Sequence, residues 1–114
     1  MHEHGLCRSL LQRVLDIGRQ HHARRIVSVE VTLGPWSGIH EAQLQHAFDE
    51  VRNGTIAAQA QLHIVSGKAV VHCLDCRQTA PVDARELRCP HCHSERVRVL
   101  NGTEMLITDI ELVN

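Results

Sequence analysis

Aromatic residues are scarce in this sequence, and long apolar runs are absent. The 114 residues include one Trp, one Phe and no Tyr, so any hydrophobic core must be largely aliphatic. No apolar run approaches the roughly 20 residues that a membrane-spanning helix needs. The N-terminal segment lacks the basic and apolar regions of a secretory signal. We therefore expect a cytoplasmic protein that does not enter a membrane.

An excess of charge of either sign is also lacking. Twelve Lys and Arg stand against thirteen Asp and Glu, which gives a net charge of −1. Surfaces that bind nucleic acids are usually strongly basic, so we expect no nucleic-acid partner. The length suits one domain or two very small ones.

Hydrophobic periodicity predicts two helices and three strands. Apolar residues recur at helical spacing in residues 3–20 and 40–52. They alternate with polar residues in residues 26–33, 60–65 and 104–113. We expect Val27 and Leu33 on the buried face of the first strand, and Leu106 on one apolar face of the last. Two strands make a poor sheet, so the last strand should join the first two. The predicted class is α+β, with a small three-stranded sheet and two helices.

Residues 69–100 differ in character from the rest of the chain. They hold four of the five cysteines and two of the three prolines. We therefore expect a discontinuous α/β domain formed by residues 1–68 and 101–114. A ribbon domain of residues 69–100 is inserted into it. Trp36, which follows Pro35, is expected to pack at the helix–sheet junction, with a partner surface as the alternative.

The cysteines of this insertion form two CxxC pairs that are typical of a structural zinc site. Cys73 and Cys76 make the first pair, and Cys89 and Cys92 follow after twelve intervening residues. Two residues between cysteines let both thiolates reach one ion, and two such turns supply four tetrahedral sulfurs. Four protein ligands leave no open coordination position, so a catalytic role for this zinc is not expected.

Other interpretations of the cysteines are weaker. A redox-active pair needs one CxxC beside a helix, not two pairs in register. Mixed ligation that uses His72, His91 or His93 is an alternative. Cys7 lies on the predicted apolar side of the first helix, so we expect a buried thiol there.

The start of the chain offers a second kind of metal site. It reads Met1-His2-Glu3-His4. We expect Met1 to be retained before a bulky second residue, which leaves a free α-amine. That amine, the His2 amide nitrogen and the His2 imidazole can chelate one metal in a plane, with Glu3 or His4 as a fourth donor. Such donor sets are typical of Ni(II) or Cu(II). The alternative is an uncommitted chain end.

Together these features resemble the HypA/HybF family of hydrogenase-maturation nickel metallochaperones. The residues that carry the resemblance are Met1-His2-Glu3, Leu6, Ser9, Leu10, Leu33-Gly34, Leu44, Ala47-Phe48, Ala60, Leu62, Ile64, both CxxC pairs, Gly102-Thr103-Glu104, Ile107 and Ile110. Two departures lie after the cysteine pairs, where Arg77 and His93 stand in place of the usual Gly.

The resemblance implies a metal carrier that is not an enzyme. It implies transferable Ni(II) at Met1, His2 and Glu3, with His4 as an additional candidate. It implies structural Zn(II) at the four paired cysteines. The implied partners are a nickel-handling maturation GTPase, the [NiFe]-hydrogenase large subunit or its assembly complex, and, in some members, urease maturation factors.

Three alternatives to a nickel carrier stay open from the residues. A zinc-ribbon nucleic-acid module would use the arginines of the insertion, but that segment has no aromatic residue for stacking on bases. A zinc hydrolase would need HExxH or an open site, and His40-Glu41 lacks the second histidine. A scaffold could bind the same partners without nickel. Pairing of two copies through an exposed edge strand, as a homodimer, is also left open.

Overall fold

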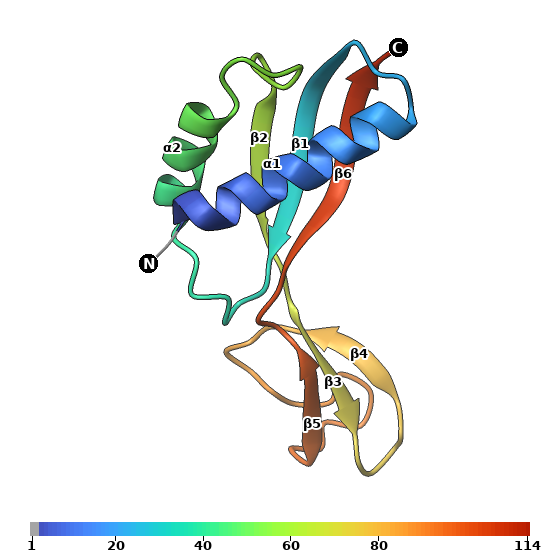
Figure 1. Cartoon of the computed structure of the whole chain (residues 1–114). Helices are drawn as coiled ribbons and strands as arrows, with labels where there is room; N and C mark the ends of the chain where they lie inside the picture. The colour runs from blue at the N-terminus through green and yellow to red at the C-terminus, as the bar shows by residue number, and fades with distance from the viewer. Residues whose placement is uncertain (1–2) are drawn as a thin grey trace. The chain divides into compact units, whose positions relative to one another are not determined.

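A computed structural model describes residues 3–114 of this protein (Figure 1). In chain order the elements are α1 (Glu3–Gln20), β1 (Arg25–Leu33), α2 (Glu41–Val51), β2 (Gln61–Ser66), β3 (Ala69–Cys73), β4 (Thr79–Val82), β5 (Val97–Asn101) and β6 (Met105–Val113). The strands form two three-stranded sheets, in the orders β2-β1-β6 and β4-β3-β5. The α+β class and the return of the last strand to the first sheet are confirmed. Within these residues, neither helix is long and apolar enough to cross a membrane.

The chain divides into two compact units. The first comprises the described part of Met1–Val31, together with Ile39–Val65 and Ile107–Asn114. The second comprises Thr32–Gly38 and Ser66–Leu106. Both helices belong to the first unit, and the four paired cysteines belong to the second.

The first unit buries the apolar stripes of both helices. Helix α1 crosses the sheet β2-β1-β6, and α2 packs beside α1 (Figure 1). The stripes meet because apolar residues at helical spacing lie on one face of each helix. The side chains that they bury are Cys7, Leu10, Leu11 and Val14 from α1 and Leu44, Ala47 and Phe48 from α2.

One expectation about strand faces is wrong. In β1 the alternation holds at Val31 and Leu33, but Ile26 is fully buried and Val27 is only half-buried. Ile26 is buried because of a tertiary contact. Its amide donates to the Ile56 carbonyl at 2.9 Å, which holds the start of β1 against the segment after α2. Leu106 is 54% exposed and lies near the start of an outer strand.

The second unit is a small antiparallel sheet. Strand β3 pairs with β4 on one side and with β5 on the other. Its buried apolar cluster is only Ala69, Val71 and Val82. Strand β4 has no counterpart in the sequence pattern, since Pro81 argues against a strand. The structure tolerates it there because β4 is an outer strand.

Two glycines let chain segments cross closely within the second unit. The Gly34 amide donates to the Glu104 carbonyl at 2.8 Å, and the Trp36 amide donates to the Gly102 carbonyl at 2.7 Å. A Cβ added to Gly34 would lie 2.3 Å from the Gly102 carbonyl oxygen. The Trp36 ring lies against Gly102 and is 43% exposed, so Trp36 packs on this crossing and is not a core residue.

We expect Gly34→Ala to lower the free energy of unfolding by roughly 1–3 kcal/mol, because the added methyl group meets backbone that cannot rotate away. Gly5→Ala is the matched control, since nothing lies within 4 Å of its Cβ position in α1. That control should be neutral or stabilising by up to about 1 kcal/mol. Urea unfolding measures the free energy of unfolding of both variants in the zinc-loaded state. Equal effects of the two substitutions would contradict the close crossing of the chain at Gly34.

Candidate metal sites

The first cysteine pair forms a tight turn at the end of β3. The Cys73 amide donates to the Gln78 carbonyl at 2.9 Å, and the Arg77 amide donates back to the Cys73 carbonyl at 3.0 Å. Inside this turn, the amides of Asp75 and Cys76 both donate to the Cys73 sulfur at 3.4 Å. The backbone therefore directs two N–H dipoles at the first sulfur.

The second pair repeats this arrangement. The Cys89 amide donates to the Ser94 carbonyl, and the His93 amide donates to the Cys89 carbonyl, both at 2.9 Å. The amides of His91 and Cys92 donate to the Cys89 sulfur at 3.4 Å. The two turns are thus equivalent, as their identical spacing predicts.

The four sulfurs of these turns converge on one point. All lie within 4.8 Å of one another. Across the two turns, the Cys73 and Cys92 sulfurs are 3.6 Å apart, and those of Cys76 and Cys89 are 3.5 Å apart. Sulfurs about 2.3 Å from a tetrahedral zinc are separated by roughly 3.8 Å. The donor set therefore fits a closed four-thiolate site for a soft divalent cation such as zinc.

Backbone hydrogen bonds favour thiolate at the first cysteine of each turn. The pKa of the Cys73 thiol is lowered to about 6, chiefly by the hydrogen bond from the Cys76 amide and also by that from the Asp75 amide, against an opposing effect of burial. The pKa of Cys89 is lowered in the same way, first by the Cys92 amide. Burial and hydrogen bonds with the neighbouring cysteine sulfurs instead raise the pKa values of Cys76 and Cys92. A metal ligand must be deprotonated, so the first cysteine of each turn is prepared for ligation and the second must lose its proton to the incoming ion.

A carboxylate that the sequence did not single out links the two turns. Asp75 lies inside the first turn and accepts hydrogen bonds from the Ser94 hydroxyl at 2.5 Å and from the Arg96 guanidinium at 2.6 Å. This contact spans residues that are about twenty positions apart, which explains why no local spacing signals it. It holds the chain after the second turn against the first turn.

Most arginines of the second unit are neutralised by neighbouring carboxylates. The ion pairs are Arg85–Asp83 at 3.0 Å, Arg88–Glu95 at 3.6 Å and Arg96–Asp75 at 2.6 Å. Such pairing leaves less positive charge to bind the phosphate groups of a nucleic acid. It gives the nucleic-acid alternative no support.

At the start of the chain, the structure describes only part of the predicted nickel site. Met1 and His2 lie outside the described residues, so their assignment stays a prediction. Glu3 is the first residue of α1 and is only 6% exposed. Its Oε2 atom has no hydrogen-bond partner among the described residues. A buried carboxylate without a partner is costly unless a cation or a donor compensates it.

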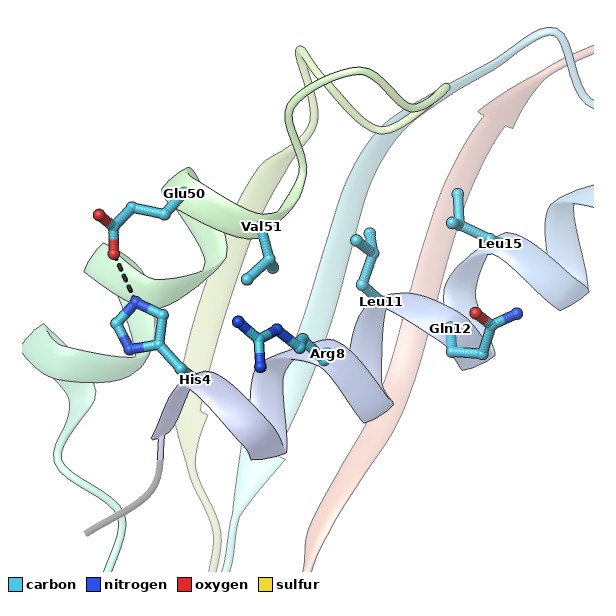
Figure 2. Close-up of a pocket in the computed structure, with 7 residues that line it drawn as sticks. All are labelled: His4, Arg8, Leu11, Gln12, Leu15, Glu50 and Val51. Atoms are coloured by element: carbon cyan, nitrogen blue, oxygen red, sulfur yellow. Dashed lines mark hydrogen bonds and ion pairs between the residues drawn. The ribbon is translucent and has the colours of Figure 1, made fainter.

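His4 is engaged by α2. Its Nε2 atom lies 2.5 Å from Glu50 Oε1, as the dashed line in Figure 2 shows. This hydrogen bond is the main cause of a lowered pKa for the Glu50 carboxyl. The same Glu50 oxygen is 3.6 Å from His46 Nε2, one helical turn earlier on α2.

Two cavities adjoin His4 in the first unit. The larger, of about 580 Å³, is lined by His4, Arg8, Leu11, Gln12, Leu15, Glu50 and Val51 (Figure 2). The smaller, of about 350 Å³, is lined by Glu3, His4, Ala42, Gln43 and His46. His46 and Glu50 were not predicted as site residues. Their spacing of one helical turn was visible in the sequence, but their proximity to His4 was not.

Cys7 is a buried thiol, as expected. It has no solvent exposure, and its sulfur donates to the Leu44 carbonyl at 3.5 Å. Burial raises the pKa of this thiol to about 11, and the negative charge of Asp49 adds to the shift. Cys7 is therefore not a ligand of the four-sulfur site.

Comparison with known proteins gives matches over the whole chain. Residues 1–112 match the family model described as "Hydrogenase/urease nickel incorporation, metallochaperone, hypA". The hydrogenase maturation factor HypA of Beijerinckia indica is 33% identical over 113 residues, which cover 99% of this chain and all of that protein. HybF of Escherichia coli K12 is 34% identical over 112 residues, which cover 98% of this chain and 99% of HybF.

A solved structure has the same fold. The solution structure of the Ni metallochaperone HypA from Helicobacter pylori superposes with a TM-score of 0.74 at 28% identity. The match covers 99% of this chain and 98% of the Helicobacter chain.

The residues after the cysteine pairs give a stability prediction. Arg77 and His93 have φ values of 68° and 65°, in the left-handed region that favours glycine. We expect Arg77→Gly and His93→Gly each to raise the stability of the zinc-loaded protein by about 1 kcal/mol. Arg98→Gly, on the exposed part of β5, is the control and should lower stability instead. Urea unfolding measures the stability of all three variants. If all three substitutions lower stability alike, the left-handed backbone at Arg77 and His93 costs no free energy.

The buried thiol gives a pH prediction. Because the pKa of Cys7 in the folded protein is about 11, above the roughly 8.5 of a free cysteine, folding favours the protonated thiol. This contribution is complete below about pH 8.5 and is lost as the pH rises toward 11. The stability gap between wild type and Cys7→Ala should therefore narrow by about 2 kcal/mol between pH 8 and pH 10.5. Urea unfolding across this range tests it, and a constant gap would refute the raised pKa.

Proposed function

The chain belongs to the HypA/HybF family of hydrogenase-maturation nickel metallochaperones, and from that premise we propose that it carries Ni(II) on its first residues. The proposed ligands are Met1, His2 and Glu3, with His4 as an additional candidate. The observation that carries this proposal is the buried Glu3 carboxylate, whose Oε2 atom finds no partner within residues 3–114. A cation held by the chain start would supply the missing charge.

The proposed role is delivery and not catalysis. A carrier must release its metal, and nitrogen and oxygen donors at a chain end can open without disturbing the packed core of α1 and α2. Copper would bind the same donors more tightly. Selectivity for nickel is therefore assigned to the supply of metal and to partner proteins.

We assign a structural zinc ion to Cys73, Cys76, Cys89 and Cys92. Four thiolates complete a tetrahedral shell and leave no position for substrate. The ion would stabilise the domain of residues 69–100, whose apolar cluster is too small to fold it alone. Residues 1–68 and 101–114 form the proposed nickel-binding domain.

The proposed partners follow from the family role. They are a nickel-handling maturation GTPase and the [NiFe]-hydrogenase large subunit or its assembly complex, in the cytoplasm. Urease maturation factors are proposed as further recipients, because the matching family model is described for hydrogenase and urease alike.

Nickel titration of the zinc-loaded, untagged protein tests the site. We expect wild type to bind one tight equivalent of Ni(II), and we expect His2→Ala to lose that equivalent while its zinc content is unchanged. His63→Ala is the control, since this exposed histidine lies on β2 and is not one of the proposed ligands. Isothermal titration calorimetry reports the tight equivalent. Equal tight binding by wild type and His2→Ala would exclude the chain start as the nickel site.

A further inference from the structure

The imidazole ring of His4, at the start of α1, borders both cavities of the first unit. Its Nε2 atom lies 2.5 Å from Glu50 Oε1, and Glu50 lines the larger cavity together with Arg8. The smaller cavity is lined by His4 and Glu3 but not by Glu50. Glu50 therefore holds one ring nitrogen of His4 from the side of the larger cavity (Figure 2).

The hydrogen bond to Glu50 determines which ring nitrogen of His4 carries the proton. A glutamate carboxylate is ionised at neutral pH and can only accept hydrogen bonds, so the His4 Nε2 atom must donate. In a neutral imidazole with its proton on Nε2, the free electron pair is on Nδ1. The Nδ1 atom has no hydrogen-bond partner within residues 3–114. Figure 2 shows this second nitrogen on the edge of the ring that faces away from Glu50 and Arg8.

We propose that Glu50 is a positioning residue of the nickel site, which holds the His4 ring so that Nδ1 is the fourth donor to Ni(II) at the chain start. This role rests on the nickel-carrier function proposed above, for which Glu3 and His4 are both candidates as that donor. Histidines that bind metals almost always donate their other ring N–H to a carboxylate, a backbone carbonyl or water. Such a partner fixes the ring and makes the ligating nitrogen more basic. His4 and Glu50 form this arrangement.

The charges around His4 favour a cation on the Nδ1 side of the ring. The smaller cavity has no Lys or Arg in its wall, and Glu3 Oε2 has no partner among the residues described. Arg8 lines only the larger cavity. His46 Nε2 also approaches Glu50 Oε1, at 3.6 Å, so His46 competes with His4 for the carboxylate and is not a ligand in this arrangement.

The contact between His4 and Glu50 can be removed without disturbing the fold. Both side chains are 53% exposed. Contacts between such exposed groups contribute little to stability. Variants at His4 and Glu50 should therefore fold, and their urea unfolding midpoints check this.

Nickel titration of the zinc-loaded, untagged protein tests the role of Glu50. We expect Glu50→Ala to lower the affinity for the tight Ni(II) equivalent by roughly tenfold to a hundredfold, the usual effect of removing a group that orients a metal ligand. Asp49→Ala is the matched control, because this exposed carboxylate precedes Glu50 on α2 and pairs with Arg52 instead of His4. Its affinity should equal that of wild type.

A double variant separates positioning from simple attraction between Glu50 and the ion. His4→Ala should weaken nickel binding at least as much as Glu50→Ala does. If Glu50 acts only through His4, adding Glu50→Ala to His4→Ala should weaken binding no further. A further loss in the His4→Ala background would overturn the positioning role, and so would wild-type affinity in Glu50→Ala.

Nitrogen-15 NMR of the histidine rings gives a readout that needs no nickel. At a pH where the ring is neutral, wild type should carry the His4 proton on Nε2, and Glu50→Ala should show both neutral forms. A mixture of forms in wild type would overturn the positioning role.

The His2→Ala variant separates this proposal from the carrier proposal. Loss of the tight equivalent in His2→Ala, together with wild-type affinity in Glu50→Ala, would refute the role of Glu50 and leave the carrier proposal standing. Retention of the tight equivalent in His2→Ala would refute both proposals.

Discussion

Convergence of the four paired cysteines is the constraint on which the second unit depends. Their sulfurs lie within 4.8 Å of one another, and backbone N–H groups favour the charged form at Cys73 and Cys89. The apolar cluster of this unit is too small to hold the two turns together alone. A divalent cation bound by the four sulfurs would supply that stabilisation, since structural zinc sites contribute on the order of 10–16 kcal/mol. In the proposed function, folding of this unit is therefore coupled to metal binding.

The first unit is held together by different forces. Helices α1 and α2 bury aliphatic side chains around Phe48, and the sheet packs against α1. This core does not need a metal. In the proposed function, polar donors at the chain start can therefore exchange an ion while the fold stays intact. One chain would then combine a metal that maintains structure with a metal that can leave.

Much of this architecture follows from local sequence patterns. Both helices and three of the strands were predicted to within about two residues, because helical and alternating periodicities are properties of short segments. The spacing of Cys73, Cys76, Cys89 and Cys92 likewise predicts the convergence of their sulfurs, since each turn is local and the two turns repeat one pattern.

Features that depend on distant partners could not be predicted. The burial of Ile26 results from a hydrogen bond to Ile56 beyond α2. Strand β4 contains Pro81 and exists because β3 offers a free edge. The contact between His4 and Glu50 joins residues 46 positions apart. In each case a pairing between distant segments determines the local structure. Local periodicity carries no information about such pairing.

The burial of Cys7 would separate the two kinds of metal chemistry proposed for this molecule. Cys7 lies one helical turn after Glu3 on α1. A thiolate there would compete for any incoming ion and bind soft metals. With a pKa of about 11 and its proton donated to the Leu44 carbonyl, the thiol stays neutral at physiological pH. In the proposed function, this keeps a soft ligand away from the nickel held by the chain start.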